Sequence, residues 1–431
     1  MVEHDTIHSM PRWTILCILI FALTLAHVPP LSAQNEAGLT HVIQPGDTWL
    51  ALSTRFDVSQ ASLIDEAGTI NSQRQPIIGT NILLHEVNSL NGKLLRPLSG
   101  GMVETAVRHG RSPWEVSLRG GQNHPYAPLL YTPIFLPGGD KPPVELPTGF
   151  SSMAISKAPA NPGEALGIQA WADPVSEAAI SLQSEPWNTF WNGHRLLAIG
   201  ATDAFFGAGT PELSIQVAEH PTWTQPWLFE DKDWFYDQVS FAATAANEQE
   251  SMQLERAQLK QIWGQITPEP LWTSTFAWPL EEYVELSSHF GARRSVNGGP
   301  YNTYHEGTDF SAYRGTPVLA PAGGKVVLAE FLVVRGGAII IDHGLGIYSG
   351  YYHLSDIKVL IGDEVGRGDV LGEVGTTGRS TGNHLHWDML IGTTWVDAED
   401  WMKGEIGDWI RAAWAGPLSN QDHLEVPSIP K

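Results

Sequence analysis

Residues 377–389 read TGRSTGNHLHWDM, and this stretch indicates most about the fold of the chain. His384 and His386 stand two positions apart. In a β-strand, residues i and i+2 point to the same face, so both imidazoles can enter one cleft. The neighbouring runs are strand-like and are separated by glycines. This pattern predicts an all-β domain and excludes a metal site on a helical H-E-x-x-H motif.

Two other short pieces extend this cluster of histidines. HEGTDF (305–310) supplies His305 and Asp309, and YYHLSD (351–356) supplies His353. A catalytic zinc commonly takes three nitrogen or oxygen ligands from the protein and keeps one position for water. Each histidine alone is more often a surface or core residue. All five residues within about 80 positions, each followed by apolar strand residues, predict a metal site.

These motifs resemble those of the lysostaphin/LytM-type murein metallo-endopeptidases, metallopeptidase family twenty-three. The resemblance covers about 120 residues and includes the supporting phrases FGAR (290–293), GTPV (315–318) and GDEV (362–365). The sequence departs from the family pattern at Asn383, where proline is frequent, and at Tyr351, near a usual glycine.

The resemblance implies one Zn²⁺ per catalytic domain, held by His305, Asp309 and His386. It implies that His353 and His384 form the catalytic pair, and it leaves open which of them is the general base. The reaction would be hydrolysis of peptide cross-links in peptidoglycan. Bound zinc polarises a scissile carbonyl and lowers the pKa of a water, and a nearby imidazole can accept that water's proton.

Residues 40–85 predict a small βααβ unit. Asp47 or Thr48 can cap the first helix and Ser59 the second, because a short side-chain oxygen satisfies free helix N–H groups. The segment resembles a LysM module, which binds N-acetylglucosamine-containing glycans. The resemblance places a sugar groove at the Pro45–Thr48 turn and the Ile77–Gly79 loop, and the predicted glycan-binding residues are Gly46, Asp47, Thr48, Ile78 and Gly79.

The rest of the chain predicts a multidomain, mainly β protein. Residues 97–138 repeat features of the first unit, which indicates either a degenerate LysM-like repeat or a β-rich spacer. Short apolar runs in residues 149–218 predict an Ig-like β-sandwich. Residues 244–266 predict a linking helix. Residues 278–416 form the expected all-β catalytic domain of the lysostaphin type.

The N-terminus and the composition limit the location and the partners. Residues 1–33 contain an apolar run followed by LSA, which predicts a signal peptide or an uncleaved membrane anchor and a location that is secreted or in the cell envelope. Membrane contact is expected only if this segment is uncleaved. A net charge of −22 argues against nucleic acid as a partner. The single cysteine, Cys17, excludes a cysteine-built metal site.

Two other functions compete with that of an active enzyme. The chain could be a non-catalytic murein-binding regulator that recruits or activates another cell-wall hydrolase, as some relatives that have lost metal ligands are. It could also be an enzyme kept latent by its N-terminal modules, because a long stretch precedes residue 278. In each case the expected partner is peptidoglycan, with glycan strands on the LysM-like unit and peptides in the catalytic cleft.

Overall fold

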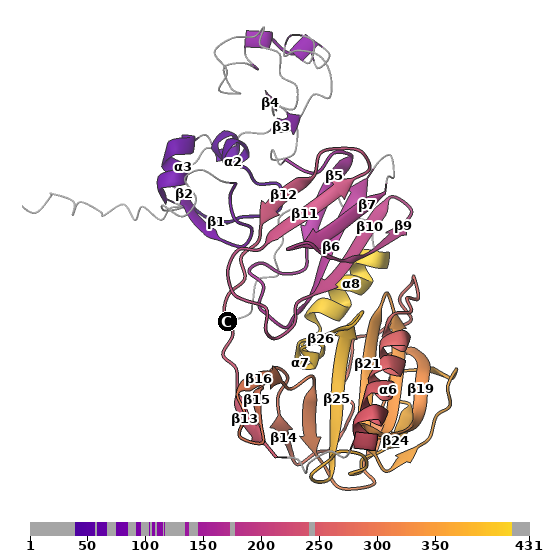
Figure 1. Cartoon of the computed structure of the whole chain (residues 1–431). Coiled ribbons are helices and arrows are strands. Elements are labelled where there is room, and N and C mark those ends of the chain that lie inside the picture. Colours follow the sequence, from indigo (N-terminus) through magenta and orange to yellow (C-terminus); the bar gives the residue numbers. More distant parts are fainter. Residues whose placement is uncertain are drawn as a thin grey trace, which may run out of the picture.

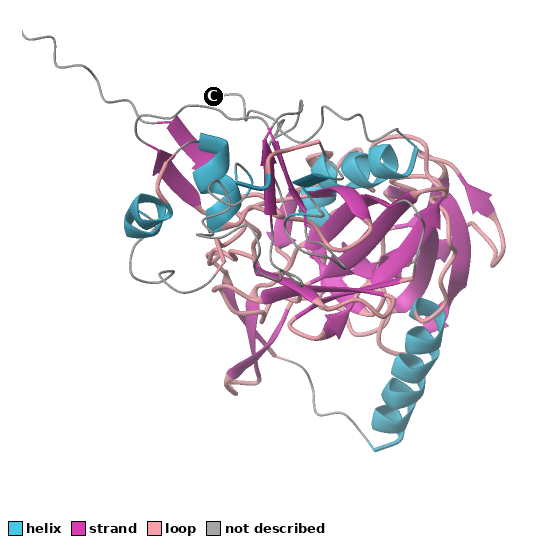
Figure 2. Ribbon diagram, turned by 90° about the horizontal axis from the view of Figure 1, so that it is seen from above, coloured by secondary structure: helices cyan, strands magenta, loops and turns pink. Residues whose placement is uncertain are grey.

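A computed structural model of the chain describes residues 39–56, 58–66, 75–84, 92–95, 134–137, 145–172, 177–240 and 246–415, with isolated positions between 103 and 116. The described chain is mainly β with few helices (Figures 1 and 2). The N-terminal segment 1–33 and most of the predicted repeat at 97–138 lie outside the described residues. Among the described residues, no helix has both the length and the apolar character of a membrane span.

The N-terminal unit has the element order strand, helix, helix, strand. Its elements are β1 (Leu39–Val42), α2 (Trp49–Phe56), α3 (Gln60–Glu66) and β2 (Asn81–Leu84). The two strands pair antiparallel. The hydroxyl of Thr48 accepts a hydrogen bond from the N–H of Ala51, and Ser59 caps α3 in the same way. A separate two-stranded sheet joins β3 (Gly92–Leu95) to β4 (Ile134–Pro137).

The middle of the chain forms two four-stranded sheets around one hydrophobic core. The first sheet has the order β5 (Phe150–Ile155), β6 (Ala165–Ala172), β10 (Arg195–Ala201), β9 (Asn188–Asn192). The second has the order β12 (Trp223–Pro226), β11 (Glu212–Val217), β7 (Ala178–Leu182), β8 (Glu185–Pro186). The second sheet continues to Pro226, beyond the boundary expected at residue 218, because β12 follows a turn that the strand pattern did not indicate.

The C-terminal part is built on one large sheet of eight strands. Its strands, in spatial order, are β14 (Glu285–Ser288), β17 (Thr308–Ser311), β25 (His384–Ile391), β21 (Ile347–Leu354), β20 (Gly336–Gly344), β19 (Gly324–Leu332) and β23 (Glu364–Val365), and β26 (Thr394–Val396) also pairs with β25. Two three-stranded sheets flank it. One joins β13 (Tyr236–Val239), β15 (Arg293–Val296) and β16 (Tyr301–Tyr304), and the other β18 (Pro317–Leu319), β24 (Val370–Glu373) and β22 (Asp356–Ile357).

Both faces of the large sheet are covered, so β20 is buried along its whole length. One face packs into the main core, which also takes in α7 (Ala398–Met402) and α8 (Glu405–Ala415). On the other face lies α6 (Ala246–Trp263), whose Leu259 and Trp263 are buried against Tyr348, Tyr352 and their neighbours. Figure 1 shows α6 alongside β21 and β19.

Helix α8 also connects the C-terminal part to the sandwich. The amide of Gln169 donates to the carbonyl of Ala413 over 3.2 Å, and that of Asn192 to the carbonyl of Trp414 over 2.9 Å. Gly167 leaves room for the Trp409 ring, because a Cβ there would lie 2.3 Å from it. The last helix is therefore shared between the two large units.

Candidate metal centre

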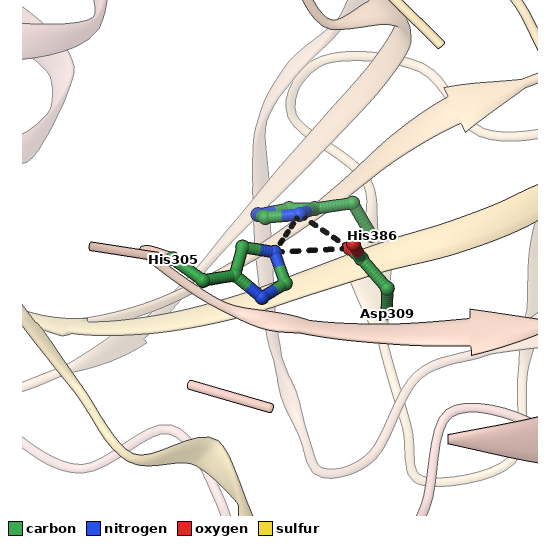
Figure 3. A group of neighbouring side chains, drawn as sticks. All are labelled: His305, Asp309 and His386. Atoms are coloured by element: carbon green, nitrogen blue, oxygen red, sulfur yellow. Dashed lines mark hydrogen bonds and ion pairs between the residues drawn. The ribbon is translucent and has the colours of Figure 1, made fainter. Parts of the chain in front are cut away.

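Three side chains aim their ligand atoms at one point in the large sheet. Nε2 of His305 lies 3.0 Å from Nδ1 of His386 and 3.1 Å from Oδ1 of Asp309. The third side of this triangle, from His386 to Asp309, is 2.8 Å. Figure 3 shows the three side chains converging from different segments. Two imidazole nitrogens and one carboxylate oxygen so close together fit a divalent metal, whose tetrahedral ligands sit about 3.3 Å apart for bonds of about 2 Å.

The strand register explains this convergence. Asp309 on β17 is directly opposite His386 on β25, and Tyr352 on β21 is opposite His386 on the other side. Residues directly opposite in neighbouring strands point to the same face of a sheet. His384 is on that face too, two positions before His386. Only His305 comes from a loop, between β16 and β17.

Hydrogen bonds at the far side of His305 set its tautomer. Its Nδ1 lies 3.1 Å from the carbonyl oxygen of His289 and 3.0 Å from the hydroxyl of Ser288. A carbonyl can only accept, so Nδ1 carries the proton and Nε2 keeps the lone pair that a metal ligand needs. This arrangement, in which the remote nitrogen of a ligating histidine is held by a hydrogen bond, is common in metal sites.

The protonation states of the three residues suit metal binding. Burial lowers the pKa of His386 to about 3, so its imidazole is neutral at pH 7. Burial alone would raise the pKa of Asp309, but its interactions with His305 and His386 hold that pKa well below the usual value. The guanidinium of Arg294 adds to this, with Nη2 3.5 Å from Oδ2 of Asp309.

His353 and His384 form a second pair beside the triangle. Their ring centroids are 4.7 Å apart, and Nε2 of His384 is 3.9 Å from Oδ1 of Asp309. Nδ1 of His353 donates to the carbonyl of Thr377 over 2.8 Å, and Nδ1 of His384 donates to the carbonyl of Gly382 over 2.8 Å. Both Nε2 atoms therefore keep a lone pair. Burial is the largest cause that lowers the pKa of His353, to about 4.

The backbone of His353 departs from normal strand geometry. Its φ is +65°, in the left-handed region that non-glycine residues rarely adopt. Strict alternation would turn its side chain away from the face that carries His386, since Tyr352 already occupies that face. The turn in the chain instead brings the imidazole to His384. Sequence periodicity could not have shown this placement, because it depends on one unusual dihedral angle.

Two of the five predicted residues line a large cavity. The cavity has a volume of about 750 Å³, and His353 and His386 are in its lining. Sequence reasoning missed several lining residues, among them Arg294, Arg335 and Tyr352. Glu306 also lines the cavity, with its carboxylate 3.9 Å from Arg335. None of these residues carries a recognisable spacing signal, because each enters the cavity from a different segment.

Other candidate residues near the site have structural partners. His289 binds the carboxylate of Glu399, and His343 is fully buried between the carbonyl of Gly323 and the hydroxyl of Ser349. Asp388 accepts from the indole of Trp395 and the hydroxyl of Tyr352, and Asp342 accepts from Thr267 and from the N–H of Gly344.

The predicted glycan-binding residues have a different environment. Asp47 is 1% exposed and Ile78 is fully buried; Gly46 and Gly79 are buried as well, and Thr48 is half-buried. The sandwich covers them. Gln225 of β12 accepts from the N–H of Gly46 and donates to the carbonyl of Asp47, and Ile78 bridges to Trp227. In this arrangement the sandwich covers the expected sugar groove.

Two glycines show how tight this contact is. A Cβ at Gly46 would lie 2.9 Å from a methyl of Leu146, and one at Gly79 would lie 3.0 Å from the backbone of Pro159. Both residues have positive φ. The turn and the loop are therefore shaped to fit the sandwich. The carboxylate of Asp47 is also engaged, 2.7 Å from Nε2 of His41.

The region that contains the candidate metal centre matches a described family. Residues 303–398 match Peptidase family M23, and this range contains all five residues of the two clusters. Peptidoglycan DD-endopeptidase ShyA of Vibrio cholerae is 37% identical over 114 residues, 26% of this chain and 26% of that protein. DD-carboxypeptidase/endopeptidase Mpg of Neisseria meningitidis is 39% identical over 109 residues, 25% of each.

The chain thus matches about a quarter of the length of these curated relatives. A solved structure from Pseudomonas aeruginosa, described as belonging to peptidase M23, aligns with 58% of this chain and 96% of its own. The sequence identity is 26% and the TM-score is 0.44.

Proposed function

We propose that this chain, whose residues 303–398 match Peptidase family M23, is a peptidoglycan hydrolase that cleaves peptide cross-links of the bacterial cell wall as a zinc-dependent endopeptidase. The observation that carries the proposal is the triangle of ligand atoms from His305, Asp309 and His386 next to two imidazoles with free Nε2 atoms. The names of the relatives, a peptidoglycan DD-endopeptidase and a DD-carboxypeptidase/endopeptidase, support the choice of substrate.

The roles of the side chains follow from their hydrogen bonds. His305, Asp309 and His386 would hold the zinc, which when bound polarises the scissile carbonyl and makes a water more acidic. The Nε2 atoms of His353 and His384 are proton acceptors, because a carbonyl fixes the proton on each Nδ1. One imidazole takes the proton of the attacking water, and a proton returns to the leaving amine. The low pKa of His353 favours the release of a proton that it has accepted.

Targeting to glycan strands belongs to the same proposal, with one condition. A LysM-like unit would raise the local concentration of substrate at the cleft by holding a glycan strand near it. Its predicted binding residues are covered by the sandwich, so targeting requires that Gly46 and Asp47 separate from Gln225. The proposed location is outside the cytoplasm, secreted or in the cell envelope, because peptidoglycan is found there.

A regulator without catalytic activity is the alternative, but no structural observation favours it. A regulator that lacks metal ligands would show a broken triangle, whereas all three ligand atoms here lie within 3.1 Å of one another.

The test is to measure zinc content and fragment release from purified peptidoglycan, for the full chain and for His386→Ala. We expect the unsubstituted protein to bind one zinc and to release peptide fragments. The His386→Ala variant should lose both the zinc and at least about 10³-fold in rate, because the metal supplies several kcal/mol of stabilisation to the transition state. Fragment release that is equal in the two proteins, or absent from both, would contradict the proposal.

A further inference from the structure

Helix α6 forms one wall of the cavity that contains His353 and His386. Five of its residues line the cavity at helical spacing: Met252, Arg256, Leu259, Lys260 and Trp263. Leu259 and Trp263 are buried in the core on this face of the sheet, so the helix is a fixed part of the wall. The carboxylate of Glu255 strengthens the attachment, because it accepts from the N–H of Val334 over 2.8 Å and pairs with Arg335 over 3.1 Å.

The cavity lining is strongly cationic. It contains five cationic residues and one acidic residue, Glu306; the cations are Arg256, Lys260, Arg294, Arg335 and Arg379. Two acidic residues just outside the lining pair with two of these cations: Asp309 with Arg294, and Glu255 with Arg335. The cations still outnumber the acidic residues when Asp309 and Glu255 are included. The chain as a whole carries a net charge of −22. A positive cavity in an acidic protein concentrates its local field on an anionic ligand.

The cations of α6 are placed at some cost to the helix. Arg256 and Lys260 are its only cations, and they stand at i and i+4. Like charges at this spacing lie on the same side of a helix and repel each other. Lys260 stands in the last turn, where a cation interacts favourably with the helix dipole, but this gives no reason for a second cation one turn earlier on the same side. An anion held between the two cations would offset their repulsion.

Arg256 and Lys260 are both available to a ligand. Arg335 is engaged by Glu255 and Glu306, and Arg294 by Asp309. Arg256 and Lys260 are exposed, and no carboxylate in the described part of the chain lies within ion-pair distance of either. Met252, Val296 and Val334, none of which is buried, provide apolar surface in the same cavity.

We propose that Arg256 and Lys260 bind a carboxylate of the peptide substrate and thereby determine which peptides enter the cleft. This role rests on the proposed function, because it assumes a peptide ligand. The two residues contact the substrate away from the scissile bond, while the apolar side chains of the lining contact the adjoining aliphatic part of the peptide. A neutral or amidated peptide loses this contact, so the cavity discriminates by charge.

The test is a binding measurement that requires no turnover. The probes are a soluble, uncross-linked peptide from peptidoglycan with free carboxylates and the same peptide with its carboxylates amidated. Both are titrated by calorimetry into the full zinc-loaded chain, its Arg256→Gln/Lys260→Gln variant and a control. The control, Arg314→Gln/Lys325→Gln, removes two exposed cations of the same unit that are not in the cavity lining.

We expect the unsubstituted chain and the control to bind the acid peptide about tenfold more tightly than the amide, the effect of a charge-assisted contact. The α6 variant should bind both peptides alike, at the affinity of the amide. The preference should also shrink in about 0.5 M salt, because exposed charges are screened. Equal binding of the two peptides by the unsubstituted chain, or an undiminished preference in the α6 variant, would overturn the proposal.

Failure of the proposed function gives a different result. A chain that discriminates between the acid and the amide but releases no fragments from peptidoglycan retains the carboxylate site and loses the assignment as an endopeptidase. A chain that releases fragments without discriminating retains the endopeptidase and loses the carboxylate site. The thermal unfolding temperature of the α6 variant shows whether it folds. We expect this temperature to be unchanged, because removing a like-charge pair does not destabilise a helix.

Discussion

The metal centre and the predicted glycan groove differ in their accessibility to a ligand. Both were predicted from short motifs, and in both the motif residues lie close together. At the metal centre, His353 and His386 line a cavity of about 750 Å³. At the N-terminal unit, Gly46, Asp47, Ile78 and Gly79 are buried against the sandwich. A motif thus indicates what a surface can bind, and the neighbouring domain decides whether that surface is available.

The strongest test of this comparison is His353→Ala. We expect hydrolysis of peptidoglycan to fall by about 10²–10⁴-fold, because the imidazole acts in proton transfer and general acid–base groups contribute this much. Zinc content should not change, since His353 is not one of the three converging ligands. The measurement pairs fragment release with metal analysis of the same sample. Loss of zinc from this variant would indicate that His353 is a metal ligand, and the proposed ligand set would then be wrong.

Low pH should reduce the stability of the C-terminal part, because His343 becomes protonated on unfolding. Burial lowers the pKa of its imidazole to about 4, against 6.5 in the unfolded chain. The folded state therefore binds fewer protons between these values, and stability falls as the pH drops through this window. We expect a loss of about 2 kcal/mol between pH 7 and pH 5 from this group.

Urea unfolding at the two pH values measures this loss. The His343→Gln variant should be less stable at pH 7 but should depend less on pH. A pH dependence as steep in His343→Gln as in the unsubstituted chain would assign the loss to other groups.

The smallest expected effect concerns the closed groove. Gln225→Ala removes three hydrogen bonds to the N-terminal unit, from or to Gly46, Asp47 and Pro76, and leaves their buried backbone groups unpaired. Each such loss costs about 1–3 kcal/mol. The docked arrangement should weaken, and binding of N-acetylglucosamine oligomers should rise by at least about tenfold, because a tenfold rise needs only about 1.4 kcal/mol.

The matched control for this variant is Thr224→Ala on the same strand, whose side chain points to the opposite face. Its glycan binding should equal that of the unsubstituted chain. Glycan binding that is already strong in the unsubstituted chain would show that the groove is open in solution. Binding absent from every variant would show that this unit serves only the fold.

The sequence predicts local features of this molecule better than contacts between its units. The caps at Thr48 and Ser59 and the shared face of His384 and His386 follow from short-range rules of helix and strand geometry. The positive φ of His353 could not be predicted, because the surrounding strands impose it. The same holds for Gln225, whose partners are about 150–180 residues earlier in the chain.

The paths of β13 and α8 determine which segment of this chain could be transferred to another gene and still fold. Directly after the sandwich, β13 pairs in parallel with β15 of the C-terminal part. At the end of the C-terminal part, α8 packs back against the sandwich. A gene fusion that joined the chain at residue 278 would lose β13, would remove the cavity wall formed by α6 and would strip Arg335 of its partner Glu255. The smallest segment that can be transferred intact to another gene therefore begins at the sandwich, well before the family match at residue 303.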